Sequence, residues 1–301
     1  MARLPRWVVS VAALVALCTP TGASAQRVAA RLPAGFVEQV LVEGLTRPTT
    51  MAWAPDNRLW IGGKEGYVWS LDLRDLQAPA LDAFGQIPVN TEGDHGLVGI
   101  AVDPDYSTNH HIWVYYTTDQ PIRNRLSRFR HVGQQLVDET IMLETSDLQS
   151  PIHTGGCIRF AQDKTLFVST GDDQVGNASQ NTFDLRGKIL HINRDGSPAA
   201  GNPYFDGERG DPRVWAYGFR NPWRFSLQPE SGNLFIGDVG EATHEELDLG
   251  FPGGNFGWPL AEGPTPPAVP GLRYPIYSYL HTSLLGNSIT GGEHASANNF
   301  P

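Results

Sequence analysis

A pattern of two short strands joined by an acidic turn recurs four times along the chain. Each copy has an apolar run, a turn that carries Asp or Glu, and a second run rich in aromatic and β-branched residues. The copies lie at residues 49–63, 96–116, 155–172 and 221–238. A third candidate strand follows each copy, at 66–73, 125–131, 187–194 and 245–250. Repeated units of three or four short strands are typical of β-propeller blades.

A propeller is favoured because one small twisted sheet cannot bury both of its faces, whereas sheets stacked around an axis can. The alternative all-β fold is a sandwich. Four units cover roughly residues 34–260, and the segment that starts at Tyr274 resembles the beginning of another blade. We therefore expect an all-β propeller of four blades plus part of a fifth over residues 26–301, incomplete at its C-terminal end.

The composition narrows the class of protein. The chain has 301 residues, 40% of them hydrophobic, which is typical of a globular domain. Its formal net charge of −10 argues against a nucleic-acid partner, because phosphate binding needs clustered Lys and Arg. Outside the N-terminus no segment is long and apolar enough to span a membrane.

The first 25 residues read as a secretory signal peptide. Arg3 and Arg6 precede an apolar stretch at residues 8–17, and an Ala-Ser-Ala sequence ends at Ala25. We expect cleavage after Ala25 and a periplasmic or secreted protein. Cleavage would leave Cys157 as the single cysteine, so no intramolecular disulfide is expected.

Polar residues lie directly before the first strand of three units. These residues are Asp94, His153 and Asn221, and equivalent positions in neighbouring blades point to one rim of a propeller. Asp172 ends a strand, and Arg220 precedes another. A base beside a carboxylate and an arginine suits proton abstraction with stabilisation of an anion. Alternatively, Asp172 caps a turn and Arg220 forms a surface ion pair.

A second candidate site is the acidic, glycine-rich stretch at residues 237–259. It contains Glu241, Glu245, Glu246 and Asp248. Loops rich in carboxylates and free carbonyls suit Ca²⁺, which takes six to eight oxygen ligands. The alternative is a solvated acidic turn.

Several motifs together resemble the soluble quinoprotein glucose/sorbosone dehydrogenase family, which includes the aldose sugar dehydrogenases. They are GLVGIAVDPDY, HTGGCIRF, LFVSTGDD, LRGKILHINRDG, WAYGFRNPWRFS and EELDLGFPGGNFGWP, in family order over roughly residues 34–295. The resemblance implies a six-bladed propeller that binds pyrroloquinoline quinone (PQQ) and Ca²⁺. YGFRNP and GGNFGWP at their present separation are the most specific of these motifs.

The resemblance also implies roles for individual residues. His153 falls on the catalytic base and contacts the cofactor, and Asp172 falls on the carboxylate that orients it. Arg220 would contact PQQ and stabilise charge on its reduced oxygen, and Asn221 would contact the same cofactor. Asp94 and Asp172 fall at substrate-contacting positions.

The implied metal ligands come from the acidic stretch. The backbone carbonyls of Gly240 and Glu241 fall on the Ca²⁺ next to the cofactor. Glu246 and the carbonyl of Phe256 fall on a further Ca²⁺ site. Two departures are visible, since Glu241 replaces a common proline and a Trp-Arg pair at 223–224 replaces a usual Gln-Gly pair.

The function that the resemblance implies is oxidation of an aldose at its anomeric carbon to the lactone, by His-assisted hydride transfer to PQQ. Electrons would pass to a separate acceptor, a quinone or a cytochrome. Two alternatives remain open at this point. One is a Ca²⁺-dependent propeller lactonase or other hydrolase, and the other is a non-catalytic propeller that binds a partner or glycan.

Overall fold

The computed structural model describes residues 32, 34–264, 269–282 and 286–294. The chain divides into two compact units, and the larger, residues 44–294, contains the strands that the structure describes. The predicted signal peptide and its cleavage site lie outside the described residues. No helix in the described part of the chain is long and apolar enough to cross a membrane.

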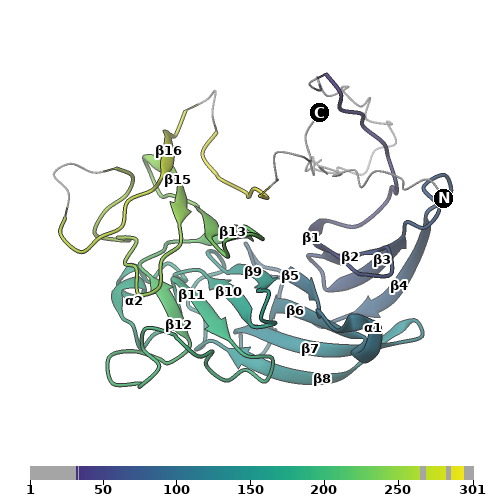
Figure 1. Cartoon of the computed structure of the whole chain (residues 1–301), viewed down its shortest axis with the longest axis horizontal. Helices are drawn as coiled ribbons and strands as arrows, with labels where there is room; N and C mark the ends of the chain where they lie inside the picture. Colours follow the sequence, from purple (N-terminus) through teal and green to yellow (C-terminus); the bar gives the residue numbers. More distant parts are fainter. Residues whose placement is uncertain (1–31, 33, 265–268, 283–285, 295–301) are drawn as a thin grey trace. The chain divides into compact units, whose positions relative to one another are not determined.

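In the described part of the chain, sixteen strands form four antiparallel sheets, each with four strands in sequence order (Figure 1). The first sheet contains β1 (Pro48–Trp53), β2 (Arg58–Gly63), β3 (Tyr67–Asp72) and β4 (Ala80–Gln86). The second contains β5 (Leu97–Val102), β6 (His111–Thr117), β7 (Asn124–Val132) and β8 (Gln135–Glu144). The third contains β9 (Gly155–Phe160), β10 (Leu166–Thr170), β11 (Lys188–Ile192) and β12 (Val214–Tyr217). The fourth contains β13 (Pro222–Leu227), β14 (Leu234–Asp238), β15 (His244–Leu249) and β16 (Tyr277–Leu280).

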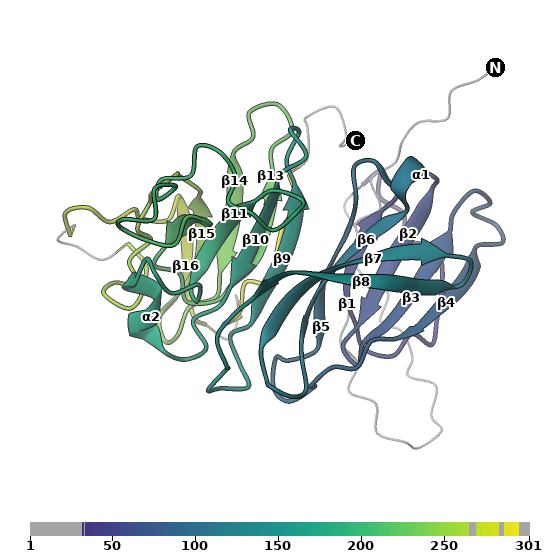
Figure 2. The same cartoon turned by 90° about the horizontal axis from the view of Figure 1, so that it is seen from below.

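The sheets are consecutive blades of a propeller. Their first strands contact one another in chain order, β1 with β5, β5 with β9 and β9 with β13 (Figures 1 and 2). Two short helices, α1 (Tyr106–Asn109) and α2 (Gly176–Gln180), lie in connections within blades. The predicted all-β propeller with four blades is confirmed, and the predicted third strands coincide with β3, β7, β11 and β15.

The segment expected to begin a fifth blade belongs to the fourth blade instead. Residues 277–280 form β16, which pairs with β15 as the outer strand of the fourth blade, with His244 opposite Leu280. The connection that leads to β16 is long, so the strand spacing of the earlier blades did not reveal it. Farther along, the backbone amide of Ile289 donates to Glu245 Oε2 at 2.6 Å, and its side chain lies near Gly237 of β14.

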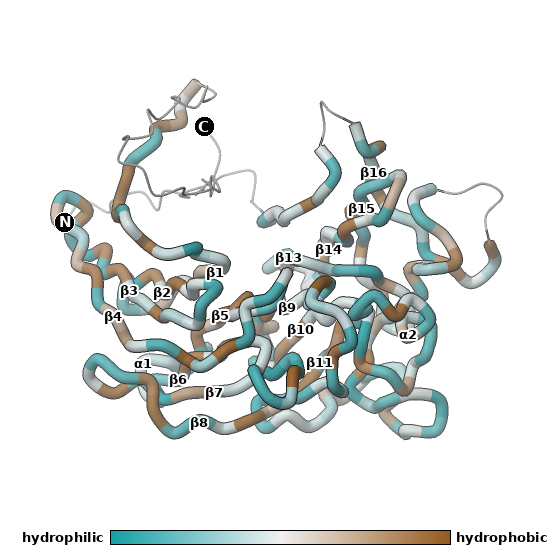
Figure 3. Tube along the Cα trace, turned by 180° about the vertical axis from the view of Figure 1, so that it is seen from behind, coloured by the Kyte–Doolittle hydropathy of each residue, from teal (hydrophilic) through white to brown (hydrophobic). Residues whose placement is uncertain are grey.

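Three apolar clusters occupy the interfaces between successive blades. One joins blades 1 and 2 around Trp60 and Ile112, and one joins blades 2 and 3 around Trp113 and Val168. The third joins blades 3 and 4 and includes the buried thiol of Cys157. Apolar residues recur along the strands, and hydrophilic ones gather in the connections (Figure 3). Burial of each large apolar side chain contributes about 1.5–3 kcal/mol, which holds the faces of neighbouring blades together.

Candidate active site

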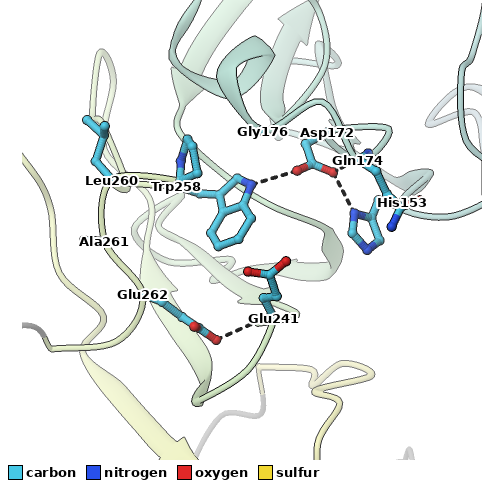
Figure 4. Close-up of a pocket in the computed structure, with 10 residues that line it drawn as sticks. His153, Asp172, Gln174, Gly176, Glu241, Trp258, Leu260, Ala261 and Glu262 are labelled. Atoms are coloured by element: carbon cyan, nitrogen blue, oxygen red, sulfur yellow. Dashed lines mark hydrogen bonds and ion pairs between the residues drawn. The ribbon is translucent and has the colours of Figure 1, made fainter.

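His153 and Asp172 form a buried pair at the start of the third blade. His153 lies just before β9, and Asp172 follows the end of β10. His153 Nδ1 and Asp172 Oδ1 form a hydrogen bond across 2.6 Å, and the two residues are 7% and 1% exposed (Figure 4). An ionised carboxylate can only accept, so it favours a proton on Nδ1, and in the neutral imidazole Nε2 is then the nitrogen that could act as a general base.

The backbone on both sides of this pair is closely packed. His153 has a φ of +64°, a left-handed conformation that L-residues with large side chains rarely adopt. A Cβ at Gly171 would lie 1.9 Å from the carbonyl oxygen of His153. Only glycine therefore allows the end of β10 to pass against the His153 backbone, which brings Asp172 within reach of the imidazole.

Asp94 and Asn221 hold the His153 segment from the neighbouring blades. Asp94 Oδ2 accepts the backbone N–H of His153 at 2.9 Å. Asn221 Oδ1 accepts the N–H of Gly155 at 3.1 Å, and the N–H of Asn221 donates to Asp238 Oδ1 at 2.7 Å. The structure brings together the three positions before the first strands, but here Asp94 and Asn221 bind backbone amides, and neither lines the cavity described below.

Arg220 lies next to this group. Its Nη1 donates to the carbonyls of Val239 and Gly240 at 3.1 and 2.7 Å, and its own carbonyl accepts the N–H of Asp172 at 2.8 Å. The guanidinium carbon is 5.5 Å from the ring centroid of Trp258. Arg220 Nε is buried and has no hydrogen-bond partner among the described residues. That nitrogen could donate to an anionic ligand.

A cavity of about 550 Å³ opens beside His153 and Asp172 (Figure 4). Its other lining residues are Gln174, Gly176, Glu241, Trp258, Pro259, Leu260, Ala261 and Glu262. Sequence reasoning assigned no role to Trp258 or Glu262, although Trp258 lies inside the GGNFGWP motif. The cavity has room for a small organic ligand and presents both members of the buried pair.

The loop that carries Gly240 and Glu241 is fixed by Glu262. Glu262 Oε1 accepts four consecutive backbone amides, those of residues 241–244, at 2.8, 3.0, 3.0 and 3.2 Å. Burial would raise the pKa of Glu262, but the four donors outweigh it and lower the pKa to about 2. Glu262 thus holds the amides of this loop in place. The carbonyls of Gly240, which also accepts Arg220 Nη1, and of Glu241 are the candidate metal ligands of the loop.

Three buried carboxylates form a second candidate cation site, between β14 and β15. Oxygens of Asp238, Glu246 and Asp248 all lie within 4.8 Å of one another. Asp238 is paired with Glu246 in the ladder, and Asp248 follows two residues later, so all three share one face of the sheet. Neither oxygen of Asp248 has a hydrogen-bond partner in the described part of the chain.

The carboxylates of this cluster are costly to keep charged without a cation. Burial, with a smaller contribution from neighbouring acids, raises the pKa of Glu246 to about 7 and that of Asp238 and Asp248 well above the usual range. Phe256, whose carbonyl the resemblance implies as a ligand, is buried and stacks on Phe219 at 4.5 Å between ring centroids. An all-oxygen donor set with an unpartnered carboxylate fits Ca²⁺. The sequence predicted Glu246, but not that Asp238 lies opposite it.

A family profile described as glucose/sorbosone dehydrogenase matches residues 45–279. The chain belongs to this family. The resemblance drawn from the motifs is thereby confirmed. The buried His153–Asp172 pair and the residues that line the cavity all lie within the matched part of the chain.

Named relatives of the family give the match more detail. The chain is 26% identical over 238 residues to aldose sugar dehydrogenase YliI of Escherichia coli, a match covering 76% of this chain and 63% of the relative. It is 24% identical over 265 residues to quinoprotein glucose dehydrogenase B of Acinetobacter calcoaceticus, covering 76% and 53%. The chain thus spans less than two thirds of these curated relatives.

A solved structure supports the same family assignment. The PQQ-bound form of aldose sugar dehydrogenase from Streptomyces coelicolor is 30% identical and superposes with a TM-score of 0.73. The match covers 81% of this chain and 71% of that one. Most of the described propeller therefore has a counterpart in a family member that binds PQQ.

Proposed function

We propose that this chain is a PQQ- and Ca²⁺-dependent dehydrogenase that oxidises an aldose at its anomeric carbon to the lactone. The observation that carries the proposal is the His153–Asp172 pair, buried at the wall of a cavity that can take a small ligand. The printed names of the Escherichia coli and Streptomyces coelicolor relatives support the substrate class, and the second supports the cofactor.

One cation beside the cavity, Arg220, suits an anionic quinone cofactor, whereas the lining itself includes the acids Asp172, Glu241 and Glu262. Arg220 has a buried Nε without a described partner, and its guanidinium lies over the ring of Trp258, which lines the cavity. A donor of this kind suits an oxygen that gains negative charge. Arg220 would therefore contact PQQ, together with His153 and, through the adjoining backbone, Asn221.

Two groups of oxygens would hold Ca²⁺. The carbonyls of Gly240 and Glu241 lie on the loop that Glu262 fixes, and Gly240 would share its oxygen with Arg220 Nη1. The further site would combine Glu246 with Asp238, Asp248 and the Phe256 carbonyl. When bound, PQQ would supply a two-electron acceptor for the hydride of the anomeric carbon, with Ca²⁺ as the Lewis acid that polarises its quinone carbonyl.

The chain's own residues would accept the proton that the sugar loses. His153 Nε2 would accept the proton of the anomeric hydroxyl while hydride leaves the same carbon, so the hydroxyl becomes the lactone carbonyl. Asp172 would stabilise the imidazolium that forms and keep the ring oriented. Asp172, which lines the cavity, would contact the sugar, whereas the carboxylate of Asp94 accepts the backbone N–H of His153 and does not line the cavity. The electrons would leave to a separate acceptor, a quinone or a cytochrome.

Export to the periplasm or the medium is part of the proposal, and it depends on the N-terminal sequence. Arg3, Arg6 and the Ala-Ser-Ala sequence that ends at Ala25 motivate it. N-terminal sequencing of the protein recovered from its host would test it. A mature chain that starts at Gln26 is the expected result, and an intact Met1 in the cytoplasmic fraction would contradict export.

The function is tested by titrating the purified chain with PQQ in Ca²⁺ and then adding an aldose. We expect saturable binding, followed by a change in quinone absorbance that depends on the sugar and disappears in His153→Asn. Binding without any reduction by a panel of aldoses would contradict the substrate class. Turnover of a lactone in the absence of PQQ would favour the hydrolase instead.

A further inference from the structure

Trp258 occupies a fixed position beside the catalytic pair. Its backbone N–H donates to the carbonyl of Gly218 at 2.8 Å, and its carbonyl accepts Gln180 Nε2 at 2.6 Å. Both partners belong to the third blade, one in the loop after β12 and one at the end of α2. The main chain of Trp258 is therefore anchored to the blade that carries His153 and Asp172.

The indole of Trp258 completes the hydrogen bonds of Asp172. Its Nε1–H donates to Asp172 Oδ2 at 2.7 Å (Figure 4). The other oxygen, Oδ1, accepts His153 Nδ1 at 2.6 Å and the N–H of Gln174 at 2.8 Å. Both oxygens of this buried carboxylate therefore accept hydrogen bonds. The indole of Trp258 donates to Oδ2, the oxygen that does not face the imidazole.

This contact decides how freely the carboxylate can turn. The terminal torsion of an aspartate is broad, so a carboxylate held at one oxygen can rotate or exchange its two oxygens. A donor on each oxygen removes that freedom. Which nitrogen of a histidine carries the proton is set by the hydrogen bond that the other nitrogen makes, so a fixed carboxylate fixes the tautomer.

We propose that Trp258 is a positioning residue that locks Asp172, so that His153 keeps its proton on Nδ1 and presents an unprotonated Nε2 to the cavity. Its effect on turnover depends on the proposed dehydrogenase function, but its effect on the imidazole does not. The same ring lies against the guanidinium of Arg220, so one side chain supports both the base and the arginine. A role in packing alone would not require the indole N–H.

The first test measures the imidazole in the protein without cofactor. Nitrogen-15 NMR distinguishes the two tautomers, and the His153 signals are identified by their loss in His153→Asn. We expect a single Nδ1–H tautomer in the wild type and a mixture in Trp258→Phe, which keeps the ring but lacks the donor. Trp223→Phe is the matched control, because Trp223 is also half-buried with an arginine against its ring, 4.8 Å from the centroid.

A wild-type tautomer that persists in Trp258→Phe would overturn the proposal. Should Trp258→Phe not fold, Asp172→Asn provides a second measurement in which the indole is untouched. The indole N–H resonance of Trp258 should then lose its downfield, charge-assisted shift. An unchanged indole resonance would show that the contact is absent in solution, which also overturns the proposal.

The second test uses turnover of the holoenzyme. We expect Trp258→Phe to lower kcat about 10–100-fold, the usual loss for an orienting hydrogen bond, with KM within about twofold because the ring over Arg220 remains. In an Asp172→Asn background the same change should have almost no further effect. Equal losses in both backgrounds would overturn the proposal. A wild type inactive with every aldose would refute only the proposed function, because the tautomer measurement needs no substrate.

Discussion

The interface between blades 1 and 2 differs in kind from the interface between blades 3 and 4. In the first, Trp60 packs at 4.6 Å from Phe84 and 5.1 Å from His131, in a cluster of apolar and aromatic side chains. In the second, an apolar cluster around Phe219 and Ile236 lies next to the carboxylates of Asp238, Glu246 and Asp248.

Both interfaces join the same kind of sheet, so the difference does not come from the blade fold. Apolar packing needs no partner beyond the chain itself. Buried carboxylates lower stability unless hydrogen bonds or a cation compensate them. The comparison indicates that apolar packing stabilises the first interface, whereas the second combines apolar packing with buried carboxylates that a bound cation would compensate.

The largest expected effect concerns the apolar interface between blades 1 and 2. Trp60→Ala removes a fully buried ring and should lower the free energy of unfolding by about 3–5 kcal/mol. Chemical denaturation measures it, and NMR of His153 reports the site. Loss of the wild-type tautomer in protein that is still folded would show that the two interfaces are coupled.

The next effect concerns His153, the proposed general base. His153→Asn should lower kcat about 10²–10⁴-fold, because the general base is lost. Asparagine is chosen because it tolerates the φ of +64° at this position, where alanine would add backbone strain. Steady-state kinetics measure the loss of activity, and a melting curve shows whether the variant is also less stable than the wild type. A variant with full activity would remove His153 from the mechanism.

A smaller effect concerns the carboxylate cluster. Ca²⁺ at about 100 times its dissociation constant should stabilise the wild type by about 2.7 kcal/mol for one occupied site. Asp248→Asn should lose part of this stabilisation, while without Ca²⁺ it should match or exceed the wild type because a buried acid is gone. Glu230→Gln, at an exposed turn, is the control. Equal stabilisation by Ca²⁺ in Asp248→Asn would exclude that residue as a ligand.

The smallest effect is the pH dependence of the loop at residues 241–244. Because the folded protein lowers the pKa of Glu262 from its ordinary 4.5 to about 2, its ionised form contributes stability above pH 4.5. This contribution disappears as the pH falls through about 2. Glu262→Gln should therefore be less stable than the wild type near neutral pH, by about 1 kcal/mol after solvent screening, with the gap closing in acid. A gap independent of pH would contradict the role of the carboxylate.

The sequence by itself determined the repeating architecture and singled out His153 and Asp172, which the structure brings together as a buried pair. Strands of period two and acidic turns are local patterns, so the third strands and the start of each blade could be placed from neighbouring residues alone. Motif order indicated the family. The blade repeat placed His153 directly before a first strand and Asp172 at a strand end, and the family resemblance implied that the two residues pair.

Only the tertiary structure decided which distant groups meet. Trp258 donates a hydrogen bond to Asp172, 86 residues away in sequence. Glu262 accepts hydrogen bonds from the amides of a loop about twenty residues earlier. β16 joins the fourth blade after a long connection, and Asp94 is committed to the amide of His153. Such contacts depend on how blades and loops pack, and packing is set by the shape and burial of many residues together, so no local pattern encodes it.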